Sequence, residues 1–201
     1  AKDPKRQPNL NVPDPSYHGM VWTEFAKAVG PIAYIVRARF VGLRDLGPAL
    51  SPTNAFQIIQ GLETVTLRME KHCSNAAKVA EYLSSHEKVS KVIYAGLDEG
   101  EAGVRANKYL KGGHGALCGF ELKGGKPSGE KFINNLNMFY HVANIGDARS
   151  LAIHPATTTH SQLSDEDMES AGVNPSYVRL SIGIEHIDDI IEDLKNALEA
   201  A

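Results

Sequence analysis

The sequence lacks a hydrophobic run long enough to cross a membrane. Hydrophobic residues make up 42% of its 201 positions, but Arg37 and Arg39 end the apolar stretch at residues 31–36. A membrane helix needs about 18 consecutive apolar residues. We therefore expect no membrane-spanning segment. The polar residues at positions 1–6 also lead us to expect no signal peptide.

Cysteine and net positive charge are also scarce. The two cysteines, Cys73 and Cys118, have no CxxC partner and no zinc-ligand spacing. They could form one disulfide, but two reduced thiols in a cytoplasmic protein are the preferred interpretation. Lysine and arginine total 21 against 24 aspartate and glutamate residues, which gives a net charge of −3. Nucleic-acid-binding domains usually carry a basic surface, so we expect no nucleic-acid partner.

Proline is concentrated near the N-terminus. Four prolines lie among polar residues within positions 1–16, and this composition predicts an extended arm or linker. Helices are predicted over residues 22–29 and 31–45. A long amphipathic helix is predicted over residues 51–86, where Ser51 can cap the first turn. Gly61 lies inside that helix, so we expect a close packing contact there.

From residue 87 onward the pattern changes to short strands and helices. Strands are predicted at residues 89–94, 116–122, 138–142 and 177–182, and helices at 98–110, 127–137, from 164, and from 187 to the end. This order predicts an α/β chain. Residues 87–201 are expected to form a small α+β domain with one sheet and helices on one face.

Arg179 lies in the middle of the predicted strand YVRLSI. The apolar residues of this strand alternate onto one face, so Arg179 and Ser181 share the other face. A buried arginine needs an anion, and its planar guanidinium matches a carboxylate with two hydrogen bonds. The pattern therefore indicates a carboxylate-binding residue. A solvated edge position and a structural salt bridge stay open as alternatives.

Two loops add polar groups without completing a catalytic set. In NIGDARSL, residues 144–151, Ser150 can donate to an anion or simply cap the loop. In HPATTTH, residues 154–160, the histidine spacing matches no standard zinc site. The glycine-rich segment at 111–115 precedes a strand, unlike a phosphate loop. The residues thus indicate an anion site, either in part of an enzyme or in a small-ligand-binding domain.

Several motifs in a fixed order resemble the Cys/Met-metabolism PLP-dependent enzymes, a family that includes cystathionine γ-synthase, the cystathionine lyases and methionine γ-lyase. They are SPTNAF (51–56), QGLET (60–64), LRM (67–69), FELKGG (120–125), SL (150–151), HPATTTH (154–160) and VRLSIGIE (178–185). The resemblance implies the C-terminal part of a fold-type-I transferase. Residues 1–50 would be the arm and the end of the cofactor-binding large domain, 51–86 the linking helix, and 87–201 the small domain with a mixed or antiparallel sheet.

The resemblance also implies residue roles. Arg179 is expected to bind the substrate α-carboxylate with help from Ser150, while Thr159 and His160 hold their loop. The segments PSYHG (15–19) and NIGDARS (144–150) are similar to the branch that converts O-acetylhomoserine and sulfide into homocysteine and acetate, for methionine biosynthesis. Arg149 stands where the lyases of the family have an acidic residue, so the substrate preference of the lyases is not expected for this chain.

The family's cofactor, pyridoxal 5′-phosphate (PLP), is implied to bind mainly outside this chain. The family's Schiff-base lysine lies in a Ser-x-Thr-Lys segment that precedes all these motifs, so we expect it upstream of Ala1. Lys108 and Lys111 lack that context and are rejected. We therefore expect no catalytic, cofactor-binding or metal-binding residue here, and no activity from the chain alone.

The implied partners are the N-terminal half of the same enzyme and further copies in a dimer or tetramer. Three alternatives stay open: another activity of the family, such as that of cystathionine γ-synthase or methionine γ-lyase, a non-catalytic amino-acid-binding module, or a catalytically dead homologue.

Overall fold

The computed structural model describes residues 3–201, and its internal contacts divide the chain into two units. One unit extends to Gln60 and the other runs from Gly61 to Ala201. Cys73 and Cys118 are free thiols, as expected, and burial raises the pKa of the Cys118 thiol to about 12. None of the helices in the described part of the chain combines the length and the hydropathy needed to cross a bilayer.

The N-terminal unit is folded where the sequence predicted an extended arm. Its elements are α1 (Pro8–Asn11), η1 (Pro15–Tyr17), α2 (Trp22–Phe25), η2 (Ala26–Ala28), α3 (Ala33–Arg37) and the π-helix η3 (Ala38–Asp45). Leu10, Trp22 and Val36 form a buried cluster, and the Trp22 indole donates to Asp14 at 3.0 Å. The arm prediction is therefore wrong for residues 8–16, because this segment packs on Trp22. Residues 1 and 2 of that prediction lie outside the described residues.

The predicted long helix is divided into α4 (Pro52–Glu63) and α5 (Val65–Ser84). Thr64 separates them with φ −114° and ψ 5°. At the break, Arg68 Nη2 donates to the Gly61 carbonyl at 2.6 Å, and Arg68 Nε donates to Thr64 Oγ1 at 3.3 Å. The expected close packing at Gly61 is absent within the described chain, because an added Cβ would meet nothing nearer than the Arg68 guanidinium at 4.0 Å.

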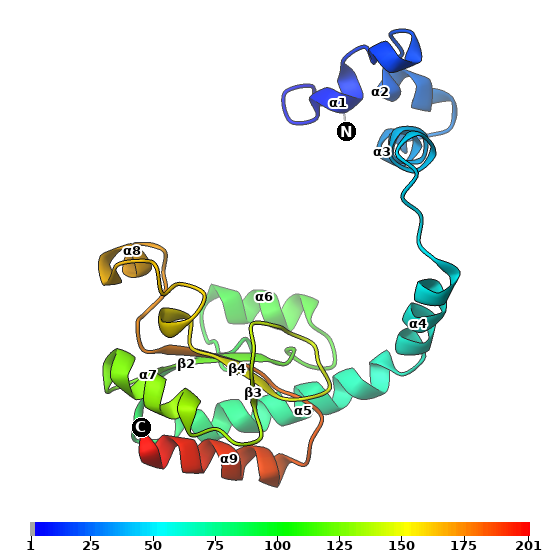
Figure 1. Cartoon of the computed structure of the whole chain (residues 1–201). Coiled ribbons are helices and arrows are strands. Elements are labelled where there is room, and N and C mark those ends of the chain that lie inside the picture. The colour runs from blue at the N-terminus through cyan, green and yellow to red at the C-terminus, as the bar shows by residue number, and fades with distance from the viewer. Residues whose placement is uncertain (1–2) are drawn as a thin grey trace. The chain divides into compact units, whose positions relative to one another are not determined.

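The C-terminal unit is built on a five-stranded sheet (Figure 1). Its strands are β1 (Val89–Ile93), β2 (Leu117–Leu122), β3 (Tyr140–His141), β4 (Leu151–Ile153) and β5 (Tyr177–Ser181). Their order is β1-β2-β5-β4-β3, and neighbours are antiparallel except for the parallel pair β3 and β4. The predicted mixed sheet is confirmed. The strand expected at 138–142 is shorter, and β4 is absent from the sequence prediction.

Helices α5, α7 (Gly125–Asn134) and α9 (Ile187–Ala200) pack on one face of this sheet, as predicted (Figure 1). The shared core contains, among others, Val79, Leu83, Cys118, Phe120, Leu122, Phe132, Val178, Leu180, Leu194 and Leu198. Helix α5 contributes to this core, and the contact division falls before it, between Gln60 and Gly61. The predicted domains at residues 1–50, 51–86 and 87–201 stay predictions.

Two further helices, α6 (Glu101–Tyr109) and α8 (Asp165–Ser170), follow β1 and β4. The Ser164 hydroxyl accepts from the Asp167 N–H at 3.1 Å and caps α8, so the predicted start of a helix at residue 164 is confirmed. Strand residues alternate between the two faces of a sheet, and the apolar ones of β2 and β5 fill the helix-covered face. Glu121 and Arg179 consequently project from the opposite face.

Candidate functional site

A pocket of about 380 Å³ lies over the face of the sheet that the three helices leave open. Residues of β1, β2, β4 and β5 line it, together with the segments that follow β3 and β4 and the segment before β5. Its charged and polar lining residues are Lys91, Glu121, Thr159, His160, Asn174, Tyr177 and Arg179. A concave site with a few convergent polar groups is the usual form of a small-ligand site.

A larger hollow, of about 580 Å³, lies in the N-terminal unit. Its charged lining residues are Glu24 and Lys27, and these two form an ion pair with each other. This hollow therefore offers no uncompensated charge, and the pocket beside Arg179 is the better candidate for binding a charged ligand.

Arg179 is half-buried on β5, opposite Gly119 of β2. A Cβ added at Gly119 would lie 2.4 Å from the ring of Tyr177, so the missing side chain makes room for that ring beside Arg179. The Arg179 Nη2 donates to the Asn144 carbonyl at 3.3 Å. No carboxylate pairs with Arg179 among the described residues, so the structural salt bridge left open by the sequence is not present there.

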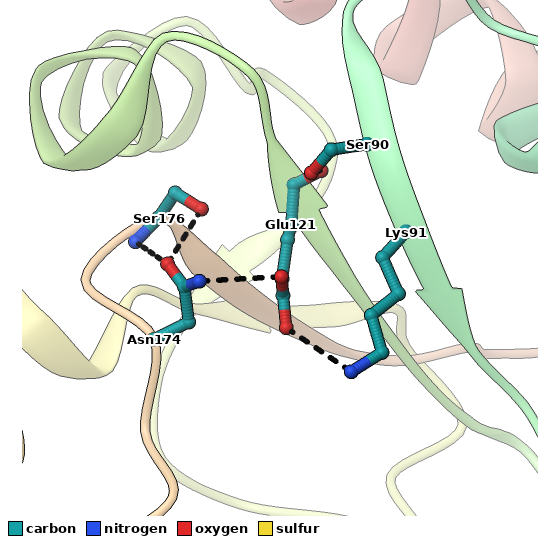
Figure 2. Close-up of polar contacts among 5 residues, drawn as sticks. All are labelled: Ser90, Lys91, Glu121, Asn174 and Ser176. Carbon is teal, nitrogen blue, oxygen red and sulfur yellow. Dashed lines mark hydrogen bonds and ion pairs between the residues drawn. The ribbon is translucent and has the colours of Figure 1, made fainter. Parts of the chain in front are cut away.

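Figure 2 shows the second charged group of the pocket, Glu121, between Lys91 and Asn174. The Lys91 Nζ lies 3.7 Å from Glu121 Oε1, and the Asn174 amide donates to Oε2 at 3.2 Å. The Ser176 N–H and hydroxyl both donate to Asn174 Oδ1 at 2.9 Å and fix that amide. Glu121 is thus compensated within the chain, whereas Arg179 is free to bind an anion.

Ser150 lies elsewhere, and the structure does not bring it into this pocket. It is fully buried; its backbone N–H donates to Glu185 Oε1 at 2.6 Å, and its hydroxyl donates to Glu185 Oε2 at 2.9 Å. The Gly183 N–H donates to the same hydroxyl at 2.9 Å. Both Ser150 donors are therefore engaged inside the chain. Its contact with a substrate carboxylate stays a prediction.

The loop after β4 is held by His154, which the sequence analysis did not single out for this role. His154 is fully buried; its Nδ1 lies 2.9 Å from Thr157 Oγ1 and its Nε2 lies 2.8 Å from the Pro175 carbonyl. A carbonyl only accepts, so Nε2 carries the proton and Nδ1 accepts from the threonine. Thr159 and His160, expected to hold the loop, contact each other at 2.9 Å and line the pocket.

Acidification is expected to destabilise the C-terminal unit through His154. Burial lowers the pKa of His154 below its ordinary value of about 6.5. The unfolded chain therefore binds the proton first, and the free energy of unfolding falls as the pH decreases from about 6.5 toward the lower folded-state pKa. Urea denaturation at a series of pH values measures this loss.

The matched variant is His154→Gln, which keeps a donor for the Pro175 carbonyl and cannot be protonated. The His154 variant should lose less stability on acidification than the wild type. Identical pH profiles for the wild type and the His154 variant would contradict the assignment.

Three lysines of the C-terminal unit are engaged within the described chain. Lys108 stacks over a neighbouring tyrosine ring at 5.1 Å, Lys111 donates to a backbone carbonyl at 2.8 Å, and neither lines the pocket. Lys91 lines the pocket but is paired with Glu121. Among the described residues, the pocket therefore holds one guanidinium without a carboxylate partner, and the lysine that lines it has one. No group of three or more metal-ligating side chains occurs among the described residues.

Comparison with known proteins identifies the family. A family model for Cys/Met metabolism PLP-dependent enzymes matches residues 17–199. An O-acetyl-L-homoserine sulfhydrylase of Leptospira meyeri is 53% identical over 197 residues, which are 95% of this chain and 45% of the relative. A homocysteine synthase of Schizosaccharomyces pombe is 48% identical over 200 residues, which are all of this chain and 46% of the relative.

A solved structure gives the same result for the fold. The crystal structure of a putative O-acetylhomoserine (thiol)-lyase from Campylobacter jejuni, which contains a pyridoxyl-lysine phosphate, matches with a TM-score of 0.82 and 42% identity. The match covers 98% of this chain and 46% of that one, so the chain spans less than half the length of the relatives it matches. These findings confirm the resemblance carried by the sequence motifs: the chain belongs to the Cys/Met metabolism PLP-dependent enzyme family.

Proposed function

We propose that this chain is the C-terminal portion of a PLP-dependent O-acetylhomoserine sulfhydrylase and that it binds the substrate α-carboxylate through Arg179. The intact enzyme would convert O-acetylhomoserine and sulfide into homocysteine and acetate. The observation that carries the proposal is a half-buried guanidinium in a pocket, with no carboxylate partner in the described chain. The names of the relatives support the sulfhydrylase branch.

Arg179 would act by orientation. Its planar guanidinium can donate two parallel hydrogen bonds to a carboxylate, and the contact of Nη2 with the Asn144 carbonyl restricts how the group rotates. A carboxylate held at two points fixes the direction of the neighbouring Cα–H bond. Holding a reacting bond in the productive orientation lowers the entropic part of the activation barrier. PLP, bound mainly by the rest of the enzyme, supplies the electron sink. None of the described residues is assigned to it.

The proposed partners are the rest of the enzyme and further copies of it in a cytoplasmic dimer or tetramer. The apolar side chains expected to contact them are exposed: Phe56 by 62%, Ile59 by 54%, Leu62 by 61% and Leu67 by 68%. Exposed apolar patches commonly mark protein contacts. This supports packing of α4 and the start of α5 against another polypeptide surface.

An assay of the intact enzyme tests the proposed reaction. O-acetylhomoserine with sulfide should give homocysteine and acetate with a higher kcat/KM than O-acetylhomoserine with cysteine, the reaction of a cystathionine γ-synthase. Methionine alone should not be degraded. Preference for cysteine as the acceptor, or breakdown of methionine, would assign the enzyme to another branch of the family.

A further inference from the structure

We propose that Glu185 is the positioning residue of the Arg179 clamp. Its carboxylate holds Ser150, and Ser150 directly follows the 144–149 loop, whose first residue accepts a hydrogen bond from Arg179. The inference rests on the proposed role of Arg179 in binding the substrate carboxylate. It assigns Glu185 no contact with the substrate.

The contact between Glu185 and Ser150 uses both carboxylate oxygens. Oε1 accepts from the serine N–H at 2.6 Å and Oε2 accepts from its hydroxyl at 2.9 Å. The hydroxyl in turn accepts from the Gly183 N–H at 2.9 Å, which completes a chain of donors that ends on the carboxylate. Hydrogen bonds to a carboxylate are stronger than neutral ones, and linked bonds polarise one another. Glu185 thus fixes both the backbone and the side chain of Ser150.

The backbone near Glu185 also approaches the loop too closely for a side chain to fit between them. A Cβ added at Gly183 would lie 2.3 Å from Glu185 Oε2 and 2.5 Å from the Ala148 carbonyl oxygen. The Ile184 N–H donates to that same carbonyl at 2.9 Å. Residues 183–185 and the C-terminal end of the 144–149 loop are therefore joined by backbone and side-chain contacts together.

Helix α5 anchors the other side of this connection. The Asn75 amide donates to the carbonyls of Gly183 and Glu185, both at 3.0 Å, and the His72 Nδ1 donates to the Ile182 carbonyl at 2.6 Å. His72 and Asn75 are 2% and 1% exposed, so water does not compete for these bonds. The backbone of Glu185 is thereby held by a helix of the core, which allows the residue to act as a fixed point for the loop.

The N-terminal end of the loop reaches the clamp. The Gly146 N–H donates to the Ser181 hydroxyl at 3.2 Å, and Arg179 Nη2 donates to the Asn144 carbonyl at 3.3 Å. The acceptors of these bonds are neutral, whereas Ser150 donates to a carboxylate, so the bonds at the Glu185 end of the loop are the stronger ones. A displacement of Ser150 would move the Asn144 carbonyl, and Arg179 would lose the contact that limits its rotation.

The test is Glu185→Gln in the intact enzyme, alone and combined with Arg179→Lys. Glutamine keeps the size and can accept from the Ser150 N–H, but its NH₂ group cannot accept from the hydroxyl. We expect the KM for O-acetylhomoserine to rise about ten-fold while kcat changes less than about two-fold. In the Arg179→Lys background, Glu185→Gln should raise KM no further, because its effect passes through Arg179.

Glu192→Gln, at an exposed position of α9, is the matched control and should leave KM unchanged. If Glu185 had only a structural role, Glu185→Gln would lower Tm and would change activity by the same factor in the wild-type and Arg179→Lys backgrounds. That result would overturn the inference. An unchanged KM in folded Glu185→Gln would also overturn it. If Arg179→Lys itself leaves KM unchanged, the proposed carboxylate clamp fails instead, and the two failures are thus distinguishable.

If Glu185→Gln does not fold, Ser150→Ala replaces it. That variant retains the backbone bond to Glu185 and removes the hydroxyl bonds, so a smaller rise of about three-fold in KM is expected. No rise should appear in the Arg179→Lys background. Equal effects in both backgrounds, or no effect in the wild-type background, would again overturn the inference.

Discussion

Replacing Arg179 by lysine should lower kcat/KM of the intact enzyme for O-acetylhomoserine by about 2–4 kcal/mol, mainly through a higher KM. Lysine keeps the charge but loses the planar fork that donates two parallel hydrogen bonds. The described chain supplies no other uncompensated cation in this pocket, because Lys91 is paired with Glu121. A neighbouring side chain therefore cannot take over the carboxylate.

Steady-state kinetics with O-acetylhomoserine as the varied substrate measures the effect. Arg105→Lys, an exposed position on α6, is the control and should behave like the wild type. The bound PLP per subunit should stay unchanged in both variants, since Arg179 is assigned to the substrate. A folded Arg179→Lys enzyme with wild-type kcat/KM would remove Arg179 from the site.

Replacing Asp193 by alanine should lower the free energy of unfolding by about 3–5 kcal/mol. Asp193 on α9 is 7% exposed, and its carboxylate accepts from three successive backbone N–H groups. They belong to Asn137 at 2.9 Å, Met138 at 3.0 Å and Phe139 at 3.3 Å. Alanine would leave all three donors without a partner near the core, at the point where the chain enters β3.

Urea denaturation followed by far-UV circular dichroism measures this loss, because Trp22 lies in the other unit and does not report on it. Asp193→Asn keeps the size and one acceptor oxygen, so it should lose less, about 2 kcal/mol. The exposed Asp189→Asn on the same helix is the control. Equal stabilities of the Asp193 and Asp189 variants would contradict the proposed anchoring of this turn.

The sheet position of Arg179 could be predicted from the sequence, whereas its surroundings could not. Alternation of apolar residues along β5 is a local pattern, and it correctly placed Arg179 on the face opposite the core. The side chains that line the pocket with Arg179 are determined by the register between the strands. Lys91 meets Glu121 because β1 pairs with β2, and no feature of either segment alone indicates that pairing.

Other differences have equally physical causes. β4 has three residues, all of them buried, so it shows no alternation that could predict a strand. The 8–16 segment is polar and proline-rich, and it folds because Leu10 and Asp14 contact Trp22, which follows it in the chain. The bond between Ser150 and Glu185 joins residues 35 positions apart. The sequence did not indicate that Glu185 accepts hydrogen bonds from Ser150.

The central claim is that this chain supplies the carboxylate clamp and not the Schiff-base lysine. Its most direct test is to mix the purified chain with PLP, reduce with borohydride, and map the modified lysines by mass spectrometry. We expect no turnover of O-acetylhomoserine with sulfide, and only weak labelling scattered over exposed lysines. Stoichiometric labelling of Lys91, Lys108 or Lys111, accompanied by turnover, would contradict the claim.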